Sequence, residues 1–341
     1  MKDYRFKITD LRFKRLNSKK LFFGFLILQF VICNLQPAFS QQLPYYTQFN
    51  SNNAMLNPGV VGTKRLLDAR IDYRKQWVGI DGAPVTEGVS LNSRIMNGTM
   101  GVGISYYKDQ TGPTKRSDLS LVYSFHAKFE DVELSIGAAG QMLSYLVDGT
   151  QLYMHTPIDN AIDLTALQKK TVFDANAGAF LYNDRFHIGL SVLNLSEPTI
   201  DYFPQADTIH RTRIVVMPHI YGSVGYNWSG DADWIWENAL QVVYVQANPI
   251  TIDYNLRIHY LQKVFCGISF RIHDAIALQV GYTFKEEFHI SYSYDIITSP
   301  LRQFQSGTHE IMLIWSSNLG MGKRNKYDNN RFKRQKYGFM L

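Results

Sequence analysis

Histidine has the widest chemistry of the residue types in this sequence, because its imidazole can bind a metal or move a proton near neutral pH. Zinc sites collect histidine and cysteine at short, recurring spacings. Here no His-x-x-x-His pair occurs, and no histidine lies close to a cysteine. The sequence therefore predicts no metal site and no cofactor. The nine histidines are His126, His155, His187, His210, His219, His259, His273, His289 and His309.

A hydrolase site would need a nucleophile, a base and an orienting group held together. No nucleophile-elbow sequence or other constrained spacing marks such a set in this chain. The run Gly101-Val102-Gly103 lies inside an alternating segment, whereas a phosphate-binding loop would be followed by a helix. We therefore expect a protein that is not an enzyme. A paired serine and histidine at one rim would revive the hydrolase hypothesis.

The polar cluster at residues 73–86 is more informative, because it joins charge, aromatic rings and glycines over a short stretch. Period-two alternation puts Arg74 and Gln76 on one side of a strand, and the glycines favour a tight turn into the next strand. We expect Arg74 to form a barrel-closing ion pair with a carboxylate in the lumen, such as Asp72 or Glu87. The positions singled out are Tyr73, Arg74, Gln76, Trp77, Gly79, Gly82 and Pro84.

Alternation of apolar and polar residues dominates the chain from Leu67 onwards. Successive side chains of a β-strand point to opposite faces, so this period predicts strands. No segment with the helical period of about 3.6 residues competes over the same span. The clearest alternating segments are 67–77, 119–129, 276–284, 288–296 and 309–315.

Strand length and aromatic placement favour a membrane barrel over a soluble β-sandwich, which stays the alternative. Many segments have about nine to eleven residues, enough to cross a bilayer at a tilt and longer than most soluble strands. The mean hydropathy of −0.18 argues against a helical membrane protein and fits alternating strands. Tyrosine and tryptophan recur at segment ends, as in the aromatic girdles of barrels. These rings are Tyr73, Trp77, Tyr106, Tyr107, Tyr226, Trp228, Trp234, Trp236 and Trp315.

We therefore predict an all-β fold, a transmembrane antiparallel barrel of about fourteen strands over residues 67–317. Tight connections alternate with long ones, which predicts that both termini are periplasmic and that the long loops face outward. The long loops are 109–117, 145–170, 195–217 and 298–307. The predicted strands are 67–77, 84–95, 100–108, 118–129, 132–144, 171–181, 186–194, 218–228, 235–246, 251–260, 264–272, 275–285, 288–297 and 308–317.

Residues 41–66 do not have the pattern of a strand. Pro44, Asn57 and Pro58 interrupt any regular element, yet the segment contains aromatic and aliphatic residues that need a surface to pack against. We predict that this plug-like segment folds into the lumen of the barrel or closes its periplasmic mouth.

The first forty residues have the three parts of a secretory signal peptide. A basic stretch ends at Lys20, an apolar run extends from Leu21 to Cys33, and small residues precede Gln41. We expect residues 1–40 to be removed, and a retained membrane anchor is the alternative.

The net charge of +6 resides at the two ends of the chain. Residues 1–40 contain eight of the 35 basic and two of the 29 acidic residues, which leaves 27 of each. The tail at 318–341 has seven basic residues against Asp328, so the body between is acidic. This distribution does not support nucleic-acid binding. Once residues 1–40 are removed, Cys266 has no partner for an intramolecular disulfide.

Six short motifs follow one another in a specific order and spacing: PYYTQF at 44–49, NPG at 57–59, YRKQWVG at 73–79, GAPVT at 82–86, YSYD at 292–295 and GTHEI at 307–311. Together they resemble the PorP/SprF family of Bacteroidota outer-membrane proteins over almost the whole mature chain. Beside the positions named above, the resemblance singles out Asn57, Pro58, Tyr294, Asp295, His309 and Glu310.

The resemblance implies a barrel of the type IX secretion and gliding-motility apparatus, placed in the outer membrane of a Gram-negative cell. It implies two kinds of partner besides the outer-membrane lipid. One is the set of periplasmic components of that apparatus, and the other is a large exported surface adhesin with a C-terminal targeting domain. No catalytic residue is carried over. Gly59, where the family usually has alanine, Thr308, where serine is common, and the basic tail depart from the family pattern.

Two functions from different classes stay open. A binding module would hold an exported partner, and a polar lumen filled by the N-terminal segment would favour it. The alternative is a FadL-like passive transporter of hydrophobic small molecules, because the region of Asn57 and Pro58 resembles the plug segment of such barrels. A dry, apolar lumen would favour transport.

Overall fold

The computed structural model describes residues 43–64, 67–152, 167–202, 212–229, 233–285 and 287–317. The predicted signal peptide and the basic tail lie outside the described residues. Within the described ranges, no helix has the length and apolar character needed to cross a membrane.

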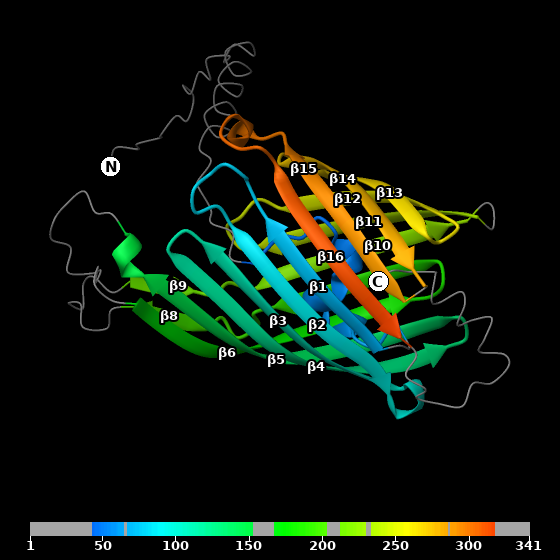
Figure 1. The fold of residues 1–341 in the computed structure, drawn as a ribbon. Coiled ribbons are helices and arrows are strands. Elements are labelled where there is room, and N and C mark those ends of the chain that lie inside the picture. The colour runs from blue at the N-terminus through cyan, green and yellow to red at the C-terminus, as the bar shows by residue number, and fades with distance from the viewer. Residues whose placement is uncertain are drawn as a thin grey trace, which may run out of the picture. The chain divides into compact units, whose positions relative to one another are not determined.

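Fourteen antiparallel strands close into a barrel, as Figure 1 shows. Strands pair with their neighbours in the sequence, except that β7 pairs with β10, and the ring closes where β1 pairs with β16. The predicted fold class is confirmed. The barrel strands are β1 (Leu67–Lys75), β2 (Val85–Ile95), β3 (Met100–Thr111), β4 (Thr114–Phe129), β5 (Val132–Asp148), β6 (Leu167–Tyr182), β7 (Phe186–Leu193), β10 (His219–Trp228), β11 (Trp234–Val245), β12 (Thr251–Tyr260), β13 (Val264–Arg271), β14 (Ala275–Phe284), β15 (Phe288–Ile297) and β16 (Thr308–Ser317).

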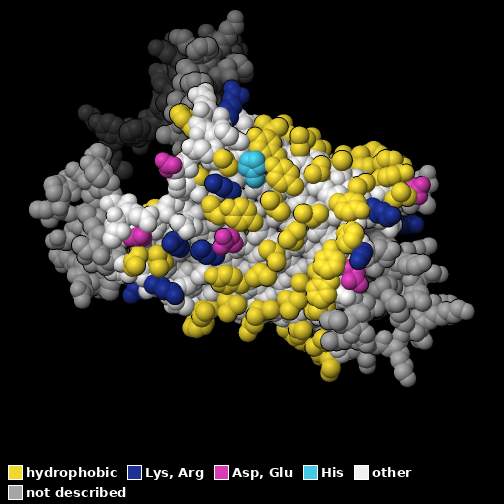
Figure 2. Space-filling model, in the orientation of Figure 1, with side chains coloured by type: hydrophobic (Ala, Val, Ile, Leu, Met, Phe, Trp, Pro, Cys, Tyr) yellow, Lys and Arg dark blue, Asp and Glu magenta, His cyan; other side chains and the backbone are white. Residues whose placement is uncertain are grey.

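The two faces of the strands have opposite chemistry. On β1, Ile71 is 55% exposed on the outer face, whereas its neighbours Arg70 and Asp72 are each 3% exposed on the inner face. Figure 2 shows apolar side chains spread over the outside of the strands, with charged side chains toward the two ends. Lipid solvates the apolar face, while the closed ring pairs the strand backbones so that no edge meets hydrocarbon.

The ends of several strands differ from the predicted boundaries. The predicted loop 109–117 is a tight turn at Gly112 and Pro113, because β3 and β4 continue their ladder to the pair Thr111 and Thr114. The predicted loop 195–217 contains two further short strands, β8 (Thr199–Tyr202) and β9 (Thr212–Val215). Alternation is weaker at strand ends, where side chains no longer face lipid.

The aromatic rings at the strand ends lie on the outer face with one exception. Tyr73, Tyr226 and Trp228 are 42%, 48% and 54% exposed, as expected for interfacial rings. Tyr107 is 8% exposed and faces the interior. Its neighbour Tyr106 faces outward, so the period of two permits only one of the pair to join the girdle.

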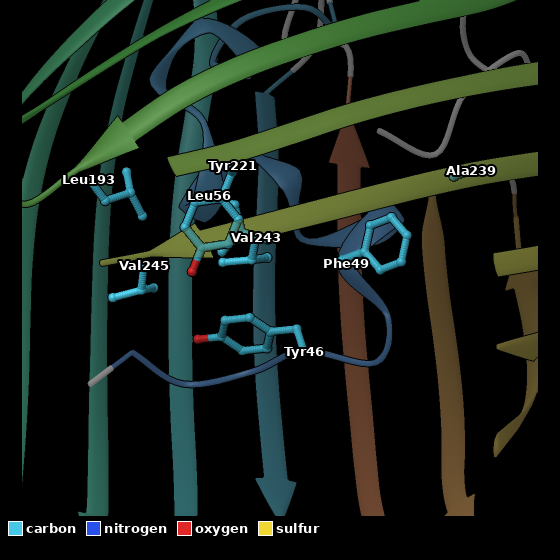
Figure 3. Packing of buried hydrophobic residues seen from close by; sticks show 8 residues of the cluster. All are labelled: Tyr46, Phe49, Leu56, Leu193, Tyr221, Ala239, Val243 and Val245. Atoms are coloured by element: carbon cyan, nitrogen blue, oxygen red, sulfur yellow. The ribbon is translucent and has the colours of Figure 1, made fainter. Parts of the chain in front are cut away.

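The N-terminal segment, residues 43–64, lies inside the barrel. It contains three short helices, η1 (Phe49–Ser51), α2 (Asn53–Leu56) and η2 (Pro58–Val60). Figure 3 shows its side chains packed against those of strands β7, β10 and β11. Burial of each large apolar side chain stabilises the fold by about 1.5–3 kcal/mol. The cluster consists of Tyr46, Phe49 and Leu56 from the segment with Leu193, Tyr221, Ala239, Val243 and Val245 from the strands.

Glycines on the inner face give the segment room to approach the wall. A Cβ atom at Gly137 of β5 would lie 2.3 Å from the carbonyl carbon and oxygen of Pro58. Gly140 of the same strand faces outward, and a Cβ atom there would meet nothing within 4 Å. The close approach at Gly137 is therefore a packing requirement of the segment rather than of the strand.

We predict that Gly137→Ala lowers the free energy of unfolding by about 1–3 kcal/mol, because the added methyl group displaces the segment at Pro58. Urea-induced unfolding of the barrel in detergent micelles measures this change. Gly140→Ala is the matched control and should leave the midpoint unchanged. Equal effects of the two substitutions would contradict the observed position of the segment.

Candidate functional site

Three of the residues singled out by the motifs meet on the inner face where the barrel closes. The Arg74 guanidinium lies 2.8 Å from Asp295 through Nη2 and 2.7 Å from Glu310 through Nη1. All three side chains are at most 1% exposed. They come from β1, β15 and β16, and together with Thr47 we call them the Arg74 cluster.

The same carboxylates hold the N-terminal segment. Glu310 accepts hydrogen bonds from the backbone N–H groups of Thr47, at 2.8 Å, and Gln48, at 3.0 Å. The Thr47 hydroxyl donates to Asp295 at 2.7 Å and accepts from Arg74 Nη1 at 2.7 Å. The first strand, the last two strands and the segment are thus joined by charge-assisted hydrogen bonds, which are stronger than neutral ones.

Strand register explains why these residues meet. Arg74 is the direct partner of Glu310 across the closing pair of strands, and Asp295 is the partner of Thr308, two residues before Glu310. Residues two apart on a strand share a face. The three side chains therefore point to the same part of the interior, although Arg74 is more than two hundred residues from either carboxylate in sequence.

Arg74 forms the expected barrel-closing ion pair, but neither Asp72 nor Glu87 is its partner. Glu87 is 55% exposed on the outer face and lies 3.7 Å from Lys108, because the residue of β2 that faces Arg74 is Thr86. Asp72 is buried on the inner face but makes no hydrogen bond to another described residue. The two carboxylates across the closing seam and on β15 bind the guanidinium in its place.

The outward neighbours of the cluster form an aromatic group. Tyr73, Tyr294 and His309 each precede a cluster residue and therefore face the opposite side of the wall. The ring centroids of Tyr294 and His309 are 5.1 Å apart, and the Tyr292 hydroxyl lies 2.7 Å from His309 Nδ1. Each of these motifs thus places one residue in the interior and one on the outer surface.

The remaining positions of the 73–86 motif shape the β1–β2 loop. Gln76 donates its backbone N–H to the carbonyl of Pro84 at 2.9 Å. Gly79 and Gly82 have φ angles of +105° and +71°, a region that favours glycine. Trp77 donates its backbone N–H to the Thr308 hydroxyl at 3.1 Å, which joins this loop to the β15–β16 loop.

Asn57 and Pro58 lie on the other side of the interior, against β5, β6 and β7. The Asn57 side chain donates to the carbonyl of Ala179 at 3.1 Å and accepts from the Gly59 N–H at 2.8 Å. Asn57 Oδ1 would lie 2.1 Å from a Cβ atom at Gly178, so the asparagine occupies the space that this glycine leaves. This motif positions the far end of the segment.

Sequence reasoning missed a second set of interior contacts to the segment. Glu237 accepts from the Asn50 side chain at 2.9 Å and lies 2.8 Å from His259 Nε2. Arg257 donates to the Ser51 hydroxyl at 2.8 Å and is fully buried. In the sequence, charged residues at inward positions of otherwise apolar strands indicate buried polar contacts in the interior. The sequence does not show which residues these charges contact.

Ser124 Oγ and His126 Nε2 lie 3.1 Å apart in the interior, and both contact the carbonyl oxygen of Val61 in the segment. Among the described residues, no group of three histidine, cysteine, aspartate or glutamate side chains could hold a metal ion. Burial raises the pKa of the Tyr46 phenol well above its ordinary value, so this side chain stays neutral beside the interior carboxylates. The arrangement holds a polypeptide segment through its backbone N–H groups and short polar side chains.

Comparison with known proteins supplies the family. Residues 38–315 match the family described as type IX secretion system membrane protein PorP/SprF. None of the curated proteins matches this chain in sequence.

One solved structure supports the fold. The CymD monoaromatic hydrocarbon channel superposes with a TM-score of 0.50 and 11% identity, over 82% of this chain and 95% of that protein. The toluene transporter TbuX of Ralstonia pickettii has a TM-score of 0.48 and 7% identity, over 77% and 92% of the two chains. At such identities the likeness concerns the barrel fold and not the cargo.

We predict that Arg74→Met lowers the free energy of unfolding by about 3–5 kcal/mol, because it leaves Glu310 buried without its cation and Asp295 with Arg271 alone, at 3.9 Å. Urea unfolding in micelles measures the loss. The triple variant Arg74→Met, Asp295→Asn, Glu310→Gln should recover part of it, since the three charges of the cluster are removed together.

The exposed pair of Lys108 and Glu87 provides the control, because Lys108→Met should cost less than about 1 kcal/mol. A triple variant as unstable as Arg74→Met alone would show that packing, and not charge, stabilises the seam.

Proposed function

This chain belongs to the PorP/SprF family of type IX secretion system membrane proteins, and from that premise we propose that its barrel binds an exported surface adhesin and supports its retention. The barrel and the family place the protein in the outer membrane as a component of this system. The adhesin, its C-terminal targeting domain and the role in gliding motility belong to the proposal. So do contacts with periplasmic components of the apparatus.

The occupied interior carries the proposal. Residues 43–64 contact inward-facing side chains of strands on opposite sides of the ring, from Glu310 of β16 to Ser191 of β7, which donates to the carbonyl of Leu56 at 2.6 Å. A lumen filled in this way favours a protein that binds a partner at its surface over one that conducts cargo. No catalytic step is part of the proposal.

The loops joined to the seam are the proposed contact surface for the adhesin. The β1–β2 loop and the β15–β16 loop are tied by backbone hydrogen bonds from Val78 N–H to the Gly307 carbonyl, at 2.9 Å, and from Ser306 N–H to the Val78 carbonyl, at 2.6 Å. Phe304, on the second loop, is 71% exposed. An exposed aromatic ring on a rigid loop is suited to anchor a protein partner.

The membrane orientation follows the distribution of connections. We call the end that carries the β1–β2 and β15–β16 loops the loop end, and the end where β1 begins and β16 ends the terminus end. Bacterial barrels have short periplasmic turns and longer outer loops. We infer that the loop end faces the exterior and that both termini of the barrel are periplasmic.

Transport of hydrophobic small molecules is the second candidate. A transporter would need an apolar route, whereas the inner wall near the segment has Ser124, His126 and Asn255 among its buried residues. Ser124 donates to the carbonyl of Val61 at 2.6 Å, so the wall binds the segment through polar contacts. This polar interior supports the binding function.

We predict that Phe304→Asp removes one or a few adhesins from the cell surface without loss of the barrel, because a charge in place of the ring weakens a desolvated contact. Quantitative mass spectrometry of sheared surface proteins measures the effect. Deletion of the whole gene should remove the same adhesins.

Leu261→Asp is the matched control, since Leu261 is 46% exposed in a turn at the terminus end. It should leave the surface proteins unchanged. Loss of every secreted protein in the deletion strain would indicate a core role in the machine, and an unchanged surface would refute both roles.

We also predict that the intact barrel conducts poorly in planar bilayers and that deletion of residues 43–64 opens a conductance, because this segment fills the lumen. Heat-dependent mobility on detergent gels confirms that each protein is folded before recording. A large conductance in the intact protein would favour the transporter.

A further inference from the structure

A row of lysines lies on the outer face of the barrel at the loop end. Lys75 is the last residue of β1, Lys115 is the second of β4 and Lys169 is the third of β6. Strand register places them on one continuous row, which runs from Lys75 through Val85, Gln110, Lys115 and Leu146 to Lys169. Lys108 of β3 lies two residues closer to the middle of the barrel than Gln110 and is 42% exposed.

These lysines face the surroundings rather than the lumen. Lys75 and Lys169 are exposed, and Lys115 and Lys108 alternate along their strands with the buried Arg116 and Tyr107. Among the described residues, Lys108 has an ion-pair partner in Glu87, at 3.7 Å, and the other three lysines have none. We call Lys75, Lys108, Lys115 and Lys169 the lysine arc.

The arc occupies only one side of the barrel. Around the other side, the outward positions near the loop end are apolar, so that part of the surface can lie in hydrocarbon. Figure 2 shows Lys and Arg side chains beside the apolar surface, with an acidic side chain among them. The apolar positions are Ile220 of β10, Tyr244 of β11, Ile252 of β12, Phe270 of β13, Ile276 of β14 and Ile296 of β15.

Acidic residues near the arc do not neutralise it. Glu87 pairs with Lys108, and Asp148, at the end of β5, attracts Lys115 and accepts hydrogen bonds from Thr150 and Gln151. Two carboxylates against four ammonium groups leave a positive field along the arc. Closer to the middle of the barrel than the arc, the outer face meets lipid, because Tyr73 and Tyr106 on the same strands are 42% and 41% exposed.

We propose that the lysine arc binds the phosphate groups of phosphorylated glycolipid in the outer leaflet. A lysine at the border of the hydrocarbon extends its ammonium group into the headgroup layer and attracts anionic lipid there. Neighbouring strands are about 4.8 Å apart, so the five intervals from β1 to β6 give an arc of about 24 Å. The arc therefore meets a ring of lipid headgroups rather than one small ion.

The position of the arc selects lipid over a protein partner. Its ammonium groups are attached to strands, at the edge of the apolar surface, whereas the proposed adhesin surface is formed by loops. The inference takes the orientation from the proposed function, but binding of lipid to the purified protein does not depend on export. A failure of the lipid-binding test therefore does not refute the proposed adhesin function, and a failure of the adhesin test does not refute lipid binding.

Native mass spectrometry of the full barrel in detergent, titrated with lipid A that carries two phosphates, tests the proposal. The variant Lys75→Gln, Lys108→Gln, Lys115→Gln, Lys169→Gln should bind at least about tenfold more weakly than the natural protein. Lipid A without phosphates should bind weakly to both. Heat-dependent mobility on detergent gels verifies that the variant is folded.

A variant with the same loss of charge at the terminus end is the control: Lys128→Gln, Arg185→Gln, Lys263→Gln, Lys285→Gln. These residues are exposed at the turns opposite the arc, and the variant should bind phosphorylated lipid A as the natural protein does. Equal affinity of the natural protein for the two forms of lipid A would overturn the proposal. The proposal would also be overturned if the arc variant bound lipid A as the natural protein does but no longer bound a polyglutamate peptide. That result would indicate that the arc binds an acidic protein.

Discussion

A chain that crosses lipid with strands must satisfy its backbone hydrogen bonds within itself, and closure of the ring between β1 and β16 is how this protein does so. The closing pair joins the two ends of the barrel sequence over nine registered positions, from Leu67 to Lys75. Everything else follows from this closure. It separates an outer face in contact with lipid from an inner face shielded from it, and each face then requires its own chemistry.

On the inner face, the N-terminal segment provides hydrogen-bond partners for buried charged side chains. Buried charges such as Arg74, Asp295 and Glu310 would be costly without partners, and Thr47 and Gln48 of the segment donate hydrogen bonds to the two carboxylates. The segment in turn could not pack so closely without glycines on the wall. The seam and the segment therefore stabilise each other through shared hydrogen bonds and close packing.

The loops at the seam and the outer face of the strands are the two surfaces that face the surroundings, and they differ in chemistry. Loops tied to the seam give a rigid platform that a protein partner can recognise, and it stands on the same hydrogen-bonded pair of strands as the Arg74 cluster. The outer strand face meets lipid, apolar over most of its area and cationic along the lysine arc. One surface therefore faces lipid and the other is available to a protein partner.

The fold was predictable because its signal is local. The period of two in the sequence predicts where the strands lie and about how many there are. For this reason Arg74 and Asp295 were assigned to strands and Tyr73 to the outer face. The partners of a residue depend on register between strands far apart in the chain. Only the closed barrel decides that Arg74 meets Asp295 and Glu310 rather than Glu87, and that Thr47 joins them, because no local pattern encodes which strand lies opposite.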